Sequence, residues 1–150
     1  IDGNAPLLSE FEDNGVVIVA PHSDTTNIVL DAESHTPPET VFGPEPSQDW
    51  CYYFEKADLA RQRGDWDQVL GLGDKALKKH LAPNDPIEWI PFLQAYAQAG
   101  DIDAMKDINR IMKKADPFVQ QQVCQSIRSM NGLSALVVKS TDEFFCSEQE

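Results

Sequence analysis

Two Gly-Asp dipeptides, Gly64-Asp65 and Gly100-Asp101, lie 36 residues apart and set the pattern of the second half of the sequence. Around each of them, apolar residues recur every three or four positions, which is the spacing of one buried face of an α-helix. Glycine tolerates the left-handed conformation that ends many helices, and aspartate is a favoured first residue for the next. Each dipeptide therefore predicts the turn of a helical hairpin, and the offset predicts two hairpins in succession.

The residues around these turns resemble tetratricopeptide repeats (TPR), in which units of roughly 34 residues form two antiparallel helices. The matching positions in the first block are Tyr53, Ala57, Ala60, Gly64, Trp66, Ala76 and Leu77. Those in the second block are Trp89, Phe92, Tyr96, Gly100, Ile102 and Pro117. The first block departs from the pattern at Gly73, where a bulky residue is usual, and by two extra residues near 81–84. The resemblance implies a mainly α fold of TPR-like antiparallel helical hairpins, with about five helices.

Other residues mark where helices begin and end. Asp85-Pro86 and Asp116-Pro117 have the form of helix starts, with aspartate as N-cap and proline in the first helical position. Glu88 is expected to reach back as the partner of a capping box. A third helix over 118–130 would seal the second hairpin through an apolar face of Val119, Val123, Ile127 and Met130. Gly71 and Gly73 predict a local weakening of the helix that contains them.

The first 48 residues follow another pattern. Four prolines fall within 36–46, a stretch that cannot propagate a helix or form a central strand, so 36–48 is expected to be a linker. Before it, β-branched runs at 15–20 and 27–30 predict two short strands, and 6–11 a short helix. The expected organisation is a small α/β segment (1–35), the Pro-rich linker (36–48), a TPR-like domain (49–132) and a C-terminal tail (133–150).

The chain is strongly acidic, with 25 Asp and Glu against 12 Lys and Arg and a net charge of −13. This balance argues against nucleic acid as a partner, because phosphate binding needs clustered basic side chains. No Lys or Arg precedes Lys56. Short cytoplasmic flanks of membrane spans are rich in both, so an extracytoplasmic location is expected.

The three cysteines, Cys51, Cys124 and Cys146, are widely spaced and form no CxxC motif. One of them must stay unpaired in a monomer. Cys51 and Cys124 have apolar neighbours at helical spacing and are interpreted as small buried hydrophobic residues, whereas Cys146 lies in a polar tail and its state stays open. The redox compartment is therefore not determined by the cysteine count.

No residue pattern predicts an active site. His22, Asp24 and His35 have the chemistry of metal ligands, but their spacing is nonspecific and a polar loop is favoured. No Gly-x-Ser-x-Gly elbow or Cys-His nucleophile signature is present. We therefore predict no catalytic, metal or cofactor site in these 150 residues.

A second, looser resemblance concerns the whole chain and rests on residues 42–46, 49–66 and 84–89. The chain is similar to the soluble C-terminal region of large bacterial multi-spanning membrane proteins. Many of those proteins are assigned as glycosyltransferases that use lipid-linked sugars. The match, together with a first residue that is Ile1 and not Met, predicts a fragment or processed form of a larger chain. The membrane spans and catalytic acids of such a parent would lie outside these residues, so no catalytic residue is carried over.

The expected function is a non-catalytic interaction or scaffolding domain of a membrane protein. The alternative is an accessory domain that positions the acceptor of a membrane glycosyltransferase. In the TPR register, the residues that line the partner groove are Phe54, Asp58, Arg61, Ile90, Gln94 and Ala97. Their mixture suits an extended peptide or a glycan, with Phe54 as the anchor. An equally weighted reading is that the first segment or the tail fills the groove, since Phe144 and Phe145 are apolar.

Overall fold

The structure is a computed structural model that describes residues 9, 11–22, 24, 29, 33, 35–44, 47–112 and 115–146. It is mainly helical, and no strand occurs among those residues. The α-helices are α1 (Asn14–Val19), α2 (Glu39–Phe42), α3 (Trp50–Gln62), α4 (Trp66–Lys78), α5 (Ile90–Ala99), α6 (Ile102–Met112), α7 (Pro117–Arg128) and α8 (Ala135–Thr141). Shorter turns are the 3-10 helices η1 (Ala20–His22) and η2 (Pro86–Trp89) and the π-helical turn η3 (Asp142–Cys146).

Both predicted hairpin turns are confirmed. Gly64 and Gly100 have positive φ angles of 71° and 75°, which glycine adopts without the steric cost that a side chain would bring. The side chain of Asp65 then accepts a hydrogen bond from the backbone N–H of Gln68 at 3.1 Å. The short turns reverse the chain, and α3 packs against α4 as α5 does against α6. Each pair is therefore an antiparallel helical hairpin.

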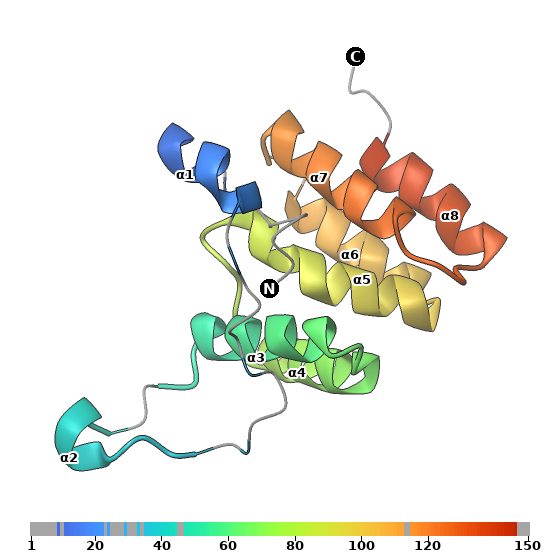
Figure 1. The fold of residues 1–150 in the computed structure, drawn as a ribbon. Coiled ribbons are helices and arrows are strands. Elements are labelled where there is room, and N and C mark those ends of the chain that lie inside the picture. Colours follow the sequence, from blue (N-terminus) through green and yellow to red (C-terminus); the bar gives the residue numbers. More distant parts are fainter. Residues whose placement is uncertain are drawn as a thin grey trace.

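Helix α5 lies at the centre of the helical stack (Figure 1). It packs against α3, α4, α6 and α7, and its residues 90–97 are all buried. A helix whose side chains are buried on every side is completely surrounded by neighbouring elements of the fold. The core of the protein is therefore built around α5.

Helices α4 and α5 approach closely at Gly73. Helix α4 runs without interruption through Gly71 and Gly73, so neither glycine breaks it, and the predicted local weakening stays a prediction. A Cβ atom at position 73 would lie 2.9 Å from Cδ1 of Phe92 and 3.1 Å from Oη of Tyr96. The small residue that departs from the repeat pattern thus makes room for the two rings of α5.

The predicted third helix is present as α7, and the chain continues as a helical partner for it. The Asp116 side chain caps α7 by accepting a hydrogen bond from the N–H of Phe118 at 2.8 Å. Beyond α7 the chain turns at Gly132, with φ 79°, and Ser134 caps α8. Residues 135–146, predicted as part of a tail, thereby form α8 and η3, which pack against α7.

The N-terminal prediction is wrong where the structure tests it. Residues 15–20, expected as a strand, belong to α1 and the start of η1, and the Asp13 side chain caps α1. β-branched residues favour a strand only where a pleated surface can bury them, and the described residues contain no strand that could provide one. The predicted helix at 6–11 and strand at 27–30 lie mostly outside the described residues. Helix α2 falls inside the predicted linker, and neither α1 nor α2 has a buried residue.

No helix in the described part of the chain combines the length and the apolar content needed to cross a bilayer.

Candidate functional site

Three of the predicted groove residues share one face of α3. Phe54, Asp58 and Arg61 follow each other by four and three positions, and all three are half-buried. Arg61 Nε donates a hydrogen bond to Asp58 Oδ1 at 2.7 Å, and Gln62 Nε2 donates to the other carboxylate oxygen at the same distance. The α3 face, as we call these three residues, therefore places an aromatic ring beside a preformed Asp–Arg pair.

The other three predicted groove residues, on α5, are not accessible. Ile90, Gln94 and Ala97 have exposed fractions of 0%, 7% and 1%. The reason is that α7 packs over α5, and Gln94 Nε2 donates a hydrogen bond to the backbone oxygen of Ser126 at 3.1 Å. Gln94 thus links α5 to α7, and all three side chains are buried in this structure, so their expected role in a partner groove stays a prediction.

An aromatic cluster joins the first hairpin to the second. The ring of Trp50, at the start of α3, lies 4.7 Å from that of Trp89 and 5.4 Å from that of Phe92, measured between centroids. Trp50 Nε1 also donates a hydrogen bond to Glu88 Oε2. Glu88 thus pairs across the hairpins and not with its own helix start, where Asp85 alone caps η2.

Burial raises the pKa of Glu88 above its ordinary value. The hydrogen bond from Trp50 opposes this shift by favouring the carboxylate, whereas the nearby negative charges of Asp85 and Glu55 add to it. The folded protein therefore favours protonated Glu88 more than the unfolded chain does.

Tyr96 connects α5 to α4 beside Gly73. Its hydroxyl donates a hydrogen bond to Asp74 Oδ1 at 3.4 Å. Burial, with the negative charge of Asp74 as the next cause, raises the pKa of Tyr96 far above its ordinary value. The phenol is therefore a neutral donor and a structural contact.

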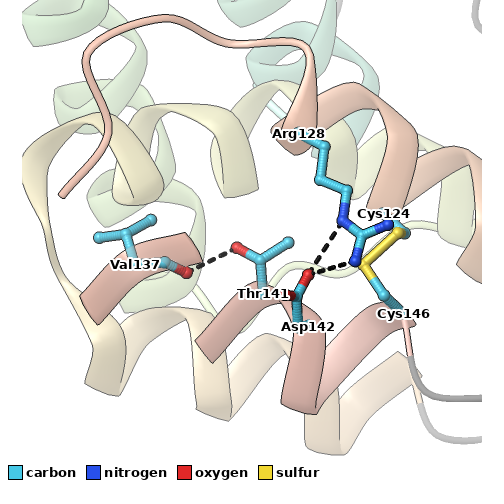
Figure 2. Close-up of polar contacts among 6 residues, drawn as sticks. All are labelled: Cys124, Arg128, Val137, Thr141, Asp142 and Cys146. Atoms are coloured by element: carbon cyan, nitrogen blue, oxygen red, sulfur yellow. Dashed lines mark hydrogen bonds and ion pairs between the residues drawn. A yellow bond between two sulfur atoms is a disulfide. The ribbon is translucent and has the colours of Figure 1, made fainter. Parts of the chain in front are cut away.

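The cysteines differ from the sequence-based interpretation. Cys124 of α7 and Cys146 of η3 form a disulfide, with their Cα atoms 5.2 Å apart (Figure 2). Cys51 is exposed and free. Cys124 was expected to be unpaired and Cys51 to be buried. The pairing depends on the reversal of the chain at Gly132, which returns α8 and η3 to α7. The apolar pair at 144–145 was the available signal that this segment packs against the core.

Polar contacts reinforce the same junction. Arg128 donates two hydrogen bonds to Asp142 Oδ1, from Nε at 2.9 Å and from Nη2 at 2.6 Å (Figure 2). Within α8, Thr141 Oγ1 donates to the backbone oxygen of Val137 at 2.9 Å. The buried hydroxyl of Thr141 is thereby satisfied inside its own helix.

Among the described residues, no three His, Cys, Asp or Glu side chains are grouped so that they could hold a metal ion. His22, Asp24 and His35 belong to that part of the chain and form no such group. Comparisons with protein-family models, with curated proteins and with solved structures find no match for this chain.

Proposed function

We propose that the chain is a non-catalytic protein-interaction or scaffolding domain of a larger membrane protein, built as a stack of TPR-like helical hairpins. The packing supports this proposal. Three helix pairs follow each other along the chain, and the first helices of successive pairs also contact each other, α3 with α5 and α5 with α7. Arrays of stacked helix pairs commonly serve as binding surfaces.

The observation that carries the proposal is the α3 face. Phe54 is partly exposed next to the core, and the pair of Asp58 and Arg61 lies one and two turns further along the same helix. A ring offers apolar contact, and a fixed ion pair offers both a donor and an acceptor to a peptide backbone. The α3 face therefore suits an extended peptide segment that places an apolar side chain on Phe54.

The disulfide supports an extracytoplasmic location. Disulfides persist mainly in oxidising compartments such as the bacterial periplasm, and the cytosol keeps most thiols reduced. The bond between Cys124 and Cys146 joins two helical elements of the folded domain. This agrees with the lack of Lys and Arg before Lys56.

The test uses the purified, oxidised domain immobilised on a resin and exposed to membrane extract. Captured proteins are then purified and titrated against the wild type and against Phe54→Ala and Arg61→Ala. We expect each variant to bind a true partner at least about tenfold more weakly, which is the loss typical of a central contact residue. Leu59→Ala is the matched control, because Leu59 is 39% exposed on the same helix but off this face. Variants that bind every partner as tightly as the control does would contradict the proposal.

A second candidate is an accessory domain that positions a glycan or protein acceptor for a glycosyltransferase using lipid-linked sugars. The resemblance that rests on residues 42–46, 49–66 and 84–89 favours it. Titration with oligosaccharides, followed by NMR, discriminates the two candidates. Chemical-shift changes at Phe54 with a glycan and none with peptides would favour the second.

A further inference from the structure

The segment formed by α8 and η3 is attached to the rest of the protein along one side. Helix α8 packs against α7, and η3 packs against α7 and α6. The side chains that face inward are Val137, Ser140, Thr141 and Phe145. The outward side exposes the apolar Leu136 (63%) and Val138 (42%) together with the charged Lys139 and Glu143. In Figure 1 this segment forms an outer edge of the helical stack.

The noncovalent attachment of this segment is small. Helix α8 has 7 residues and η3 has 5, and helices of this length do not persist in water without packing. Only two large apolar side chains, Val137 and Phe145, are fully buried from it among the described residues. The ion pair of Arg128 and Asp142 is about half exposed on both sides, and such pairs contribute little.

The disulfide holds the far end of the same segment. The chain enters α8 through the turn at Gly132, and Cys146, the last residue of η3, is bonded back to Cys124 in α7. The segment is therefore tethered at both ends, across a sequence separation of 22 residues. Closing a loop of this size restricts the detached state enough to favour the docked state by roughly 100-fold.

We propose that α8 and η3 form a redox-dependent clasp, which a dithiol reductant of the thioredoxin class opens while the hairpins α3–α4 and α5–α6 stay folded. Opening uncovers the apolar surface of α7 that the clasp covers. The inference does not depend on the proposed function, because it rests only on the packing and the disulfide of this end of the stack.

Opening of the clasp is a thiol–disulfide exchange in which the dithiol supplies the electrons and protons. One thiolate of the dithiol attacks Sγ of Cys146. Cys146 is half-buried and therefore more accessible than Cys124, which is only 7% exposed. The bond between the two protein sulfurs breaks, and Cys124 leaves as a thiolate that takes up a proton. The second thiol of the reductant then attacks the mixed disulfide and releases Cys146. Two electrons and two protons pass to the protein, and the dithiol becomes a disulfide.

The test is amide hydrogen exchange with mass spectrometry, in a Cys51→Ser background that removes the exposed thiol and prevents reshuffling. With dithiothreitol as the dithiol, exchange across 135–146 should accelerate about 100-fold, while 50–62 and 90–99 change by less than about threefold. Reoxidation should restore protection. A Cys146→Ser variant, which places a small polar residue at a half-buried site, should show the open pattern without reductant.

Two outcomes would overturn the clasp. Full protection of 135–146 after reduction, verified by alkylation of both thiols, would show that packing alone holds the segment. Simultaneous loss of protection in every helix would show that the disulfide stabilises one cooperative unit and not a separable segment.

Discussion

Replacement of Gly73 by alanine tests whether close packing or helix propensity decides the stability of α4. Alanine is better than glycine inside a helix by about 1 kcal/mol, so propensity alone predicts stabilisation. At Gly73 the added methyl would meet the ring of Phe92 at 2.9 Å and the hydroxyl of Tyr96 at 3.1 Å. Neither group can move freely, because Phe92 is 1% exposed and its ring centroid lies 5.4 Å from that of Trp50.

Overpacking of a well-packed core costs about 1 to 3 kcal/mol, which exceeds the gain in propensity. We therefore expect Gly73→Ala to lower the free energy of unfolding by about 1 kcal/mol, with a fall in Tm of about 3 °C. The measurement is urea unfolding followed by tryptophan fluorescence, with thermal unfolding followed by circular dichroism.

Gly71→Ala is the matched control, since Gly71 lies in the same helix and a Cβ there would meet no atom within 4 Å. It should raise the free energy of unfolding by about 0.5 to 1 kcal/mol. A Gly73→Ala protein as stable as Gly71→Ala would refute the reasoning, because it would mean that α4 and α5 can separate at no cost.

Three further predictions concern contacts between helical elements. Trp89→Ala should lower the free energy of unfolding by about 3 to 5 kcal/mol in a urea titration, because the ring is 2% exposed in the aromatic cluster. Burial raises the pKa of Glu88, so the stability that its protonation contributes is complete below the unfolded pKa, near 4.5, and is lost as the pH rises through the folded pKa. The Glu88→Gln protein should therefore become more stable relative to the wild type over that pH range in urea unfolding. A difference in stability that stays constant with pH would contradict this. Arg128→Ala should cost less than about 1 kcal/mol by thermal unfolding, since its pair with Asp142 is exposed, and a larger loss would mean that this contact fixes α8.

The start and end points of the helices could be predicted from sequence because they depend on local backbone chemistry. Gly64 and Gly100 end helices for the steric reason that the sequence suggested, and Asp116 caps α7 as expected. The close approach at Gly73 could not be predicted, because it depends on two rings from another helix, which no local pattern reveals.

The strand wrongly predicted at 15–20 and the disulfide that was not predicted have a related cause. A strand at 15–20 needs a neighbouring strand to satisfy its backbone. The part of the chain that the structure describes holds none, and the capping side chain of Asp13 favours α1. The disulfide needs the return of the chain at Gly132, which is visible only once α8 packs on α7. Both errors come from contacts between segments and not from local propensity.

The position of each helix in the stack explains why the α3 face is open and its counterpart on α5 is closed. Helix α3 packs against α4 and α5, whereas α5 has α7 over it as well. Positions that the proposed repeat would make equivalent therefore differ in burial, and substitutions should separate them. Ile90→Ala, at a residue with no exposed surface, should lower the free energy of unfolding by about 2 to 5 kcal/mol. Phe54→Ala, at a half-buried ring, should cost clearly less, and urea unfolding of both variants measures the difference. Equal losses would show that Phe54 is a core residue like Ile90, and the α3 face would then have no aromatic side chain to offer a partner.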